Sequence, residues 1–302
     1  MIDLSVIIVS WNTVGLLDAC LASIMAHPPA CEFEVIVVDN ASTDGSAQMV
    51  HGRYPDVKVI ENERNVGFAR ANNQGLRTAV GRHLLLLNPD TEVRPNALET
   101  LMRFLERHEG AGAAGARILN PDGTLQPSCY PAPTLLNEWL HLFHLDRNRR
   151  GGMEEWDVME PRAVEVLLGA CIMVRREALD DVGYLDERFF MYSEEVDFCY
   201  RLQKAGWSLY WVPQAQVVHH GGQSTRQAAT DMFLRLYEGK LLYFRKHYGP
   251  GTARLYKVIL LLGSLSRLAL LPFTWLERPP RRAEHQALAG RYWRLMRALP
   301  AL

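Results

Sequence analysis

Acidic and amide side chains gather where apolar segments of the chain end. The segment LLLLNPDTEV (84–93) passes from four leucines into a turn that carries Asn88, Asp90 and Glu92. Four consecutive leucines are typical of a strand that is buried on both faces. In open α/β sheets, ligands bind beyond the carboxyl ends of the strands, so these carboxylates are placed for a binding site. The alternative is an ordinary turn, because Asn, Pro and Asp are turn formers.

Two other strand ends also carry polar residues. The segment VIVVDNASTDGS delivers Asp39 at its strand end and then opens a helix, where Thr43 or Asp44 is expected as the N-cap. The first apolar segment ends in Ser10 to Asn12. Neighbouring parallel strands end at one edge of a sheet, so we expect these residues and Asn88 to Asp90 to outline one polar crevice. There Asp39 is placed to accept hydrogen bonds from a base or ribose.

No phosphate-binding glycine motif accompanies these strand ends. The chain contains neither GxGxxG nor GxxxxGK[ST], which argues against a dinucleotide site or a P-loop. A divalent cation held by Asp90 would neutralise phosphate groups instead, because hard oxygen ligands suit Mg²⁺ or Mn²⁺.

A second acidic cluster, Glu194, Glu195 and Asp197, lies in FFMYSEEVDFCYRLQKAGW. Helical spacing places Glu195 on an apolar stripe, where its charged form is disfavoured, as suits a general base. Asp197 lies four residues before Arg201, so it is either a helix stabiliser or a reactant. All three acids also suit the N-terminus of a helix.

Two histidines, His219 and His220, follow a Val-Val segment and precede a Gly-Gly turn. A single histidine on an apolar face is usually structural. A neutral imidazole at this position would complete a metal shell or contact a diphosphate.

The chain alternates between strand-like and helix-like segments, which predicts an α/β fold with a largely parallel sheet. A long irregular loop is expected over residues 129–160. Strands are expected at 4–10, 33–39, 57–61, 82–88 and 112–118, and helices at 14–26, 45–53, 69–79 and 95–108.

Composition sets the class of protein. The 302 residues are 48% hydrophobic and 22% charged, as expected for a globular chain with a sizeable core. The five cysteines include no CxxC pair, which argues against a disulfide framework and a zinc knuckle and favours a reducing, cytoplasmic compartment. The apolar N-terminus lacks a basic region and a cleavage site, so we interpret it as a strand and not a signal peptide.

The C-terminal region is basic. From Lys240 onward there are twelve Lys and Arg and two Glu, whereas 21 basic and 32 acidic residues precede it. The apolar segment 255–276 favours an anionic membrane surface over nucleic acid as the partner. Lys257 and Arg267 interrupt the segment, so we expect an interfacial helix flanked by Trp275 and by Arg278, Arg281 and Arg282, not a spanning one. The alternative is a buried core or dimer helix.

Seven motifs in order resemble the family 2 glycosyltransferases, most closely their rhamnosyltransferase-like branch. The resemblance covers about residues 3–226. It implies a GT-A fold, with a Rossmann-like and mostly parallel central sheet, and inverting transfer of a sugar from a nucleotide diphosphate to a hydroxyl. The motifs are VIIVSWN, VVDNASTDGS, ERNVGFARANNQG, LLLLNPDT, LLGACIMVRREAL, FFMYSEEVDFCYRL and VVHHGGQS.

On the donor side, the resemblance implies that Asp39 binds the pyrimidine of a UDP or dTDP sugar, with Ser10 and Asn12 in the same pocket. Further contacts are implied from the stretch that follows the third strand: Asn65, Gly67 and Asn72 or Asn73. The alternative for this stretch is a loop and helix entry that Asn65 caps.

The resemblance also implies the reacting groups. The NPD of residues 88–90 stands where the family carries its metal-binding DxD, so Asp90 would hold the cation and Asn88 replaces the first aspartate. Glu195 stands at the family's catalytic aspartate, and His219 matches the family's histidine better than His220 does. The acceptor side would be formed by Gly169, Ala170, Glu194 and Asp197.

We therefore expect a catalytic domain at 1–230, with a nucleotide-sugar half at 1–118 and an acceptor half at 119–230, and a basic helical region at 231–302. The expected enzyme transfers L-rhamnose from dTDP-rhamnose, with Mg²⁺ or Mn²⁺, to a glycan or polyprenyl-linked glycan in cell-surface polysaccharide synthesis. It would lie peripherally at the inner face of a bacterial membrane, with a homodimer left open. The alternatives are a sugar nucleotidyltransferase and a non-catalytic membrane-bound scaffold.

Overall fold

The computed structural model describes residues 2–143, 145, 153, 156–221, 229–271 and 279–302. The chain forms two compact units. The first, here called the sheet unit, comprises 1–132, 152–190 and 194–227, and the second, the helical unit, comprises 133–151, 191–193 and 228–302. The sequence predicted a single boundary between two continuous regions, at residue 230. The helical unit instead also includes two segments from the middle of the chain.

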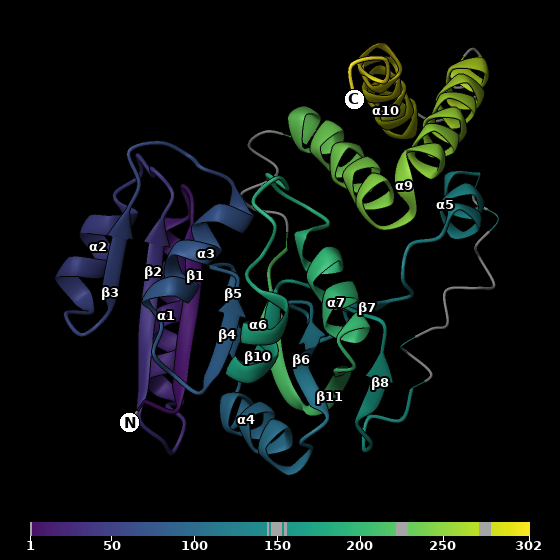
Figure 1. Ribbon diagram of the computed structural model, residues 1–302. Coiled ribbons are helices and arrows are strands. Elements are labelled where there is room, and N and C mark those ends of the chain that lie inside the picture. The colour runs from purple at the N-terminus through teal and green to yellow at the C-terminus, as the bar shows by residue number, and fades with distance from the viewer. Residues whose placement is uncertain (1, 144, 146–152, 154–155, 222–228, 272–278) are drawn as a thin grey trace. The chain divides into compact units, whose positions relative to one another are not determined.

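The strands of the sheet unit follow the expected rhythm. Their bounds are β1 Leu4–Ser10, β2 Phe33–Asp39, β3 Lys58–Glu61, β4 His83–Leu87, β5 Thr91–Val93, β6 Ala111–Leu119, β8 Arg162–Val164, β10 Cys171–Arg175 and β11 Ser208–His219. Within the described residues these nine strands form one mixed sheet of order β3-β2-β1-β4-β10-β6-β11-β5, with β8 paired to β11 (Figure 1). Strands β3, β2, β1 and β4 are parallel, whereas β10 is antiparallel to β4 and to β6.

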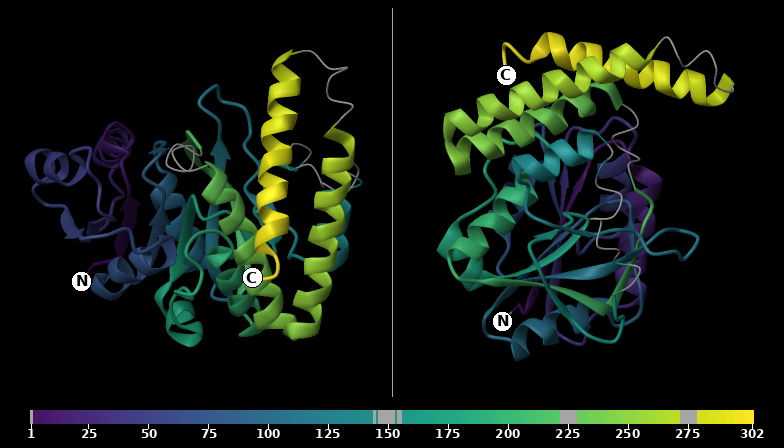
Figure 2. Two further views of the ribbon diagram at one scale, coloured as in Figure 1. Left: turned by 90° about the horizontal axis from the view of Figure 1, so that it is seen from above. Right: turned by 90° about the vertical axis from the view of Figure 1, so that its right-hand side faces the viewer.

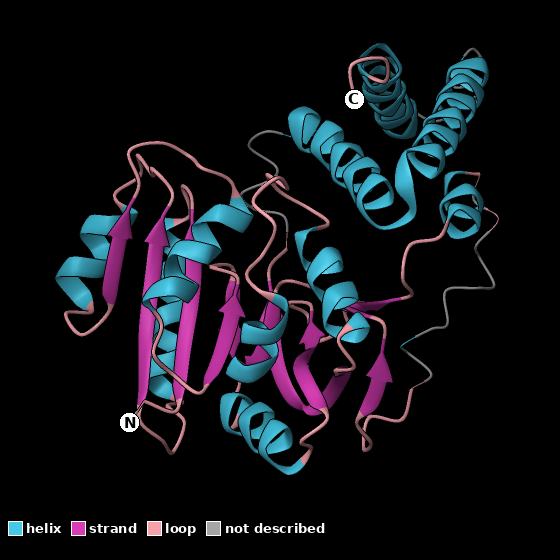
Figure 3. Ribbon diagram, in the orientation of Figure 1, coloured by secondary structure: helices cyan, strands magenta, loops and turns pink. Residues whose placement is uncertain are grey.

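Helices cover both faces of this sheet (Figure 3). They are α1 Val14–Ala26, α2 Ser46–Arg53, α3 Phe68–Thr78, α4 Ala97–Arg107, α6 Arg176–Val182 and α7 Glu194–Lys204. Successive residues of β1 contribute to opposite faces: Val6 and Ile8 belong to the core with α1 and α4, and Ile7 to the core with α3 and α7. Both faces of β1 and β4 are therefore buried, which explains their unbroken apolar sequences.

The stretch expected as one long irregular loop contains regular structure. Strand β7 (Cys129–Tyr130) pairs with β9 (Val166–Leu167), and α5 spans Leu135–Leu142. The helix begins after Thr134, whose hydroxyl accepts a hydrogen bond from the Asn137 amide at 3.1 Å. The loop prediction was wrong here because this cap and the burial of Leu142 outweigh the scattered prolines.

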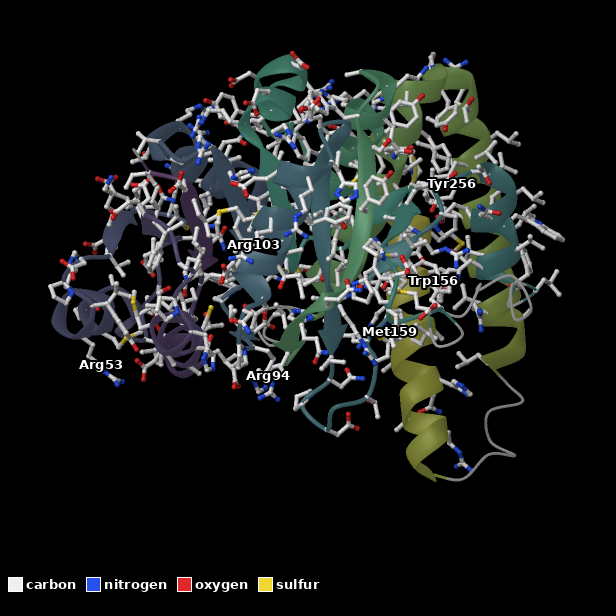
Figure 4. The ribbon with its side chains drawn as sticks, turned by 90° about the horizontal axis from the view of Figure 1, so that it is seen from below. Arg53, Arg94, Arg103, Trp156, Met159 and Tyr256 are labelled. Carbon is white, nitrogen blue, oxygen red and sulfur yellow. The ribbon has the colours of Figure 1, made fainter. Side chains whose placement is uncertain are left out.

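The helical unit consists of α5, α9 (Ala229–Leu270) and α10 (Pro279–Ala298), and α10 lies beside α9 (Figure 2). Helix α9 is interrupted at Gly249, which has a φ of 86° and precedes Pro250. Tyr256 on α9 (Figure 4) donates a hydrogen bond of 2.9 Å to Glu138 of α5, and Lys240 pairs with the same carboxylate. Because this buried carboxylate is paired, it holds α5 against α9.

The second half of α9 carries an exposed row of aliphatic side chains, here called the aliphatic face: Leu255, Val258, Leu261, Leu262 and Leu265. Their exposed fractions lie between 38% and 52%. None of the helices within the described residues is long and apolar enough to cross a membrane. Of the segment expected at the membrane, residues 272–276 lie outside the described residues, as do Arg278 and the side chain of Arg281.

Candidate active site

The ends of β1 and β2 place Ser10 and Asp39 side by side, because the two residues are partners in the parallel register. Asp39 is 4% exposed. Its Oδ2 accepts a hydrogen bond from the Ser42 amide at 3.0 Å, while its Oδ1 is buried with no partner among the described residues. A buried carboxylate oxygen without a donor is costly, so this oxygen is placed to receive a donor from a ligand.

The loop after β2 is tied to the loop after β1. The Asn12 side-chain oxygen accepts a hydrogen bond of 2.7 Å from the Thr43 amide, and the Asp44 carboxylate accepts one of 2.8 Å from the Val14 amide. The N-cap of α2 is Gly45, with a φ of 87° and no side-chain cap. The prediction of Thr43 or Asp44 as the N-cap was therefore wrong, although the Asp44 carboxylate accepts a hydrogen bond of 3.1 Å from the amide of Ser46, the first residue of α2.

Asn40, which sequence reasoning missed, organises the loop before α3. Its Nδ2 donates to Asn65 Oδ1 at 2.9 Å, and its Oδ1 accepts from the Val66 amide at 3.0 Å. Asn65 Oδ1 also accepts from the Gly67 amide at 3.0 Å. Gly67 (φ 90°) then leads into Phe68, whose amide bonds the Phe190 carbonyl at 2.7 Å. The only available signal for Asn40 was its place next to Asp39.

The two asparagines of α3 have different environments. Asn73 is fully buried, exchanges hydrogen bonds of 2.8 and 3.0 Å with the Leu185 backbone, and also donates to Glu187. Its amide is thus committed to packing α3 against the following loop. Asn72 is 1% exposed and donates to the Phe68 carbonyl within its own helix at 3.0 Å. Of the two, Asn72 stays the candidate for donor contact.

The NPD turn meets the end of β11. Asp90, 6% exposed, lies 3.2 Å from His219 Nε2 through its Oδ1. His220 instead bonds Glu92 at 2.7 Å, and its amide donates to the Asp90 carbonyl. Asn88 Oδ1 is buried and has no partner within the described residues. The structure therefore places His219, the histidine expected at the cation site, beside Asp90.

The side chains of Asp90, His219 and Asn88 fit a divalent cation. They provide a carboxylate, an imidazole and an amide oxygen, a donor set that suits Mn²⁺ or Mg²⁺. Among the described residues no group of three or more His, Cys, Asp or Glu side chains could hold a metal ion by itself. Diphosphate oxygens of a bound substrate and water would have to complete the shell.

The candidate base lies next to the same turn. The Asn88 amide donates to the Ala170 carbonyl at 3.0 Å. A Cβ atom at the preceding residue, Gly169, would lie only 3.7 Å from Glu195 Cβ. Residues 169–170 therefore connect the NPD turn to the first turn of α7, and the absence of a side chain at Gly169 leaves room beside the half-buried Glu195.

The neighbouring acids have separate roles. Asp197 is fully buried and its Oδ2 pairs with Arg201 at 2.8 Å, which favours the helix-stabilising alternative. Glu194 is 4% exposed. Burial, and then the charge of Glu195, raise the pKa of Glu194 well above its usual range.

A central sheet with helices on both faces and carboxylates at its strand ends is the architecture of the GT-A-type glycosyltransferases. Solved structures support the fold. The mannosyltransferase PcManGT from Pyrobaculum calidifontis, in complex with GDP-Man and Mn²⁺, matches with a TM-score of 0.58 at 19% identity over 98% of this chain and 84% of that one. S. aureus TarS 1–349 matches with a TM-score of 0.55 at 17% identity over 99% and 92%.

Residues 5–183 match the model of Glycosyl transferase family 2, and the chain belongs to that family. It is 36% identical over 207 residues to the N-acetylglucosaminyl-diphospho-decaprenol L-rhamnosyltransferase of Mycobacterium tuberculosis, which covers 63% of this chain and 67% of that protein. It is also 25% identical over 174 residues to the rhamnosyltransferase WbbL of Escherichia coli, which covers 55% and 66%. The resemblance to the family and to its rhamnosyltransferases is thereby confirmed.

Proposed function

We propose that this glycosyltransferase moves L-rhamnose from dTDP-rhamnose to a hydroxyl of a polyprenyl-linked glycan, with inversion at the anomeric carbon. The choice of sugar and of lipid-linked acceptor is supported by the names of its relatives. The observation that carries the chemistry is the position of residues 169–170: the Ala170 carbonyl accepts a hydrogen bond from the Asn88 amide, and a Cβ atom at Gly169 would lie 3.7 Å from Glu195 Cβ.

The donor would lie along the ends of β2, β1 and β4. Adjacent strands are spaced by about 4.8 Å, so Asp39 and Asn88, at the ends of the two strands that flank β1, are about 10 Å apart. A nucleoside diphosphate is long enough to join them. Asp39 Oδ1 would accept the pyrimidine N–H, and Asp90, His219 and Asn88 Oδ1 would hold Mn²⁺ or Mg²⁺ at the diphosphate. A bound cation stabilises the negative charge of the leaving nucleotide.

Glu195 acts as the general base in this proposal. Its carboxylate would take the proton from the acceptor hydroxyl as the oxygen attacks the anomeric carbon from the face opposite the leaving dTDP. Burial, and then the charge of Glu195, raise the pKa of the neighbouring Glu194. An acceptor hydroxyl would approach this carboxylate beside Gly169, where an added Cβ atom would lie 3.7 Å from Glu195 Cβ.

The aliphatic face of α9 would place the enzyme on an anionic bilayer, where a polyprenyl-linked acceptor resides. Aliphatic side chains exposed along about three successive helical turns are typical of an interfacial helix, and the basic C-terminal sequence complements acidic lipid headgroups. In this arrangement the protein is peripheral to the inner face of the membrane.

The test is a transfer assay with purified protein, Mn²⁺ or Mg²⁺, a synthetic N-acetylglucosaminyl-diphospho-polyprenol and a panel of dTDP and UDP sugars. We expect dTDP-rhamnose to give a rhamnosylated lipid whose anomeric configuration, read by NMR coupling constants, is inverted relative to the donor. A UDP sugar as the sole active donor would contradict the rhamnosyl assignment. Binding of nucleotide sugars without release of nucleotide would favour a scaffold instead of an enzyme.

A further inference from the structure

A second turn of the chain begins with the same letters as the cation-side turn, and it lies against the same histidine. Asn120 to Thr124 (NPDGT) follow β6, and β6 pairs with β11 so that Leu119 stands opposite Val218. The turn is closed by hydrogen bonds from the Gly123 amide to the Asn120 carbonyl, 2.9 Å, and from the Asn120 amide to the Thr124 carbonyl, 2.8 Å. The next polar side chain along the chain, Gln126, reaches His219.

A continuous row of side-chain hydrogen bonds runs from this turn to the imidazole. The Thr124 hydroxyl donates to Asp122 at 2.6 Å, and Asn120 Nδ2 donates to the Thr124 hydroxyl oxygen at 2.9 Å. Gln126 Nε2 donates to Asn120 Oδ1 at 2.9 Å. Gln126 Oε1 lies 2.6 Å from His219 Nδ1. Two groups that can only accept hydrogen bonds fix the direction of every bond in this row: the Asp122 carboxylate and the backbone carbonyl of His219.

The direction follows from the Asp122 end. Hydrogen bonds to Thr124 lower the pKa of Asp122, so its carboxylate accepts and the single hydroxyl proton of Thr124 is used there. Asn120 must then direct its NH₂ group at Thr124 and its oxygen at Gln126. This orients the Gln126 amide so that its oxygen faces His219 Nδ1, and that nitrogen must carry a proton.

A second contact orients the Gln126 amide independently. Gln126 Nε2 also donates to the backbone carbonyl of His219, at 3.4 Å, and a carbonyl oxygen can only accept. Asp122 and Thr124 are exposed, whereas Gln126 is half-buried. Water competes for the hydrogen bonds of Asp122 and Thr124, so Gln126 contributes most to the orientation of the His219 imidazole.

We propose that Gln126 is a positioning residue that holds His219 in the tautomer with the proton on Nδ1 and the lone pair on Nε2. This rests on the proposed function, in which His219 and Asp90 hold the cation. Gln126 and Asp90 favour the imidazole proton on different nitrogens. Without Gln126, the Asp90 carboxylate, 3.2 Å from Nε2, would draw the proton to Nε2. A protonated Nε2 cannot bind a metal ion, so Gln126 keeps the ligand atom available.

The test reads the tautomer directly by ¹⁵N NMR of histidine-labelled, metal-free protein at mildly alkaline pH, with His219 assigned from its loss in His219→Asn. We expect Nδ1–H in the wild type and in Gln126→Glu, which retains an acceptor for Nδ1, and Nε2–H in Gln126→Met. Gln203→Met, whose amide bonds the Glu165 and Cys199 carbonyls, is the matched control and should leave the tautomer unchanged.

Mn²⁺ titration in the presence of dTDP gives the second measurement. We expect Gln126→Met to weaken Mn²⁺ binding about 10- to 100-fold, as loss of an outer partner of a metal-binding histidine does, and Gln126→Glu to restore most of the affinity. An Nε2–H tautomer in the wild type, or an unchanged tautomer in Gln126→Met, would overturn the proposal. A wild type with the expected tautomer that binds no Mn²⁺ would instead refute the cation site of the proposed function, and with it the purpose of Gln126.

Discussion

Replacing Gly67 by alanine tests whether the donor-side loop is held in place as the structure describes. Gly67 has φ 90° and ψ 162°, a region that is essentially restricted to glycine and costs another residue about 1–3 kcal/mol. A Cβ atom there would also lie 2.7 Å from the Phe190 carbonyl oxygen and 3.2 Å from Phe190 Cα. These are backbone atoms and cannot rotate away, so overpacking adds about 1–3 kcal/mol. The expected loss of stability is about 2–6 kcal/mol.

Gly45→Ala is the matched control for this substitution. Gly45 also has a positive φ, 87°, but a Cβ atom there would meet nothing within 4 Å. Gly45→Ala should lower the free energy of unfolding only by the conformational strain, about 1 kcal/mol. Urea unfolding, with the midpoint compared at constant slope, measures both variants. If the two substitutions cost the same, the close approach of Phe190 to the loop is not what fixes Gly67.

Three further predictions concern other parts of the site and the helical unit. Burial, and then the charge of Glu195, raise the pKa of Glu194 in the folded protein, so wild-type stability should fall as pH rises above about 4. Glu194→Gln cannot ionise, and its unfolding free energy relative to wild type should rise with pH; a difference independent of pH would contradict the buried carboxyl. Asp39→Asn removes the charge of a buried acceptor, so calorimetry should show dTDP binding weakened about 10- to 100-fold, and an unchanged Kd would exclude Asp39 from the nucleotide site. Val258→Asp combined with Leu262→Asp should abolish sedimentation with vesicles of anionic lipid, whereas Met159→Asp, at a 71% exposed position of the sheet unit, should not. Retained sedimentation would exclude the aliphatic face as the membrane contact, and a change from dimer to monomer would assign that face to a second copy of the chain.

The main sheet and the position of the strand ends could be predicted from the sequence. The apolar segments that form β1, β2 and β4 are long enough to be strands buried on both faces, and parallel strands bring their carboxyl ends to one edge. Asp39 and Ser10 therefore meet in register, as predicted. The pairing of Asp197 with Arg201 was also predictable, because it depends only on helical spacing.

Contacts between distant segments could not be predicted in the same way. Asn72 and Asn73 are neighbours on one helix, and which of them bonds Leu185 depends on how α3 packs. Asn40 and Gln126 are ordinary polar residues in sequence, and their importance comes from partners 25 and 93 residues away. The helix α5 was missed because Glu138 is recognisable as a buried, paired residue only with Tyr256 and Lys240 of α9 in place.

The central claim is that Glu195 deprotonates an acceptor hydroxyl, which attacks a nucleotide sugar held at the neighbouring strand ends. The most direct measurement compares Glu195→Gln with the wild type for rhamnosyl transfer from dTDP-rhamnose and, by calorimetry, for donor affinity. A general base contributes about 10²- to 10⁴-fold, so kcat should fall by that factor while the donor Kd stays close to that of the wild type. An unchanged kcat in Glu195→Gln would contradict the account.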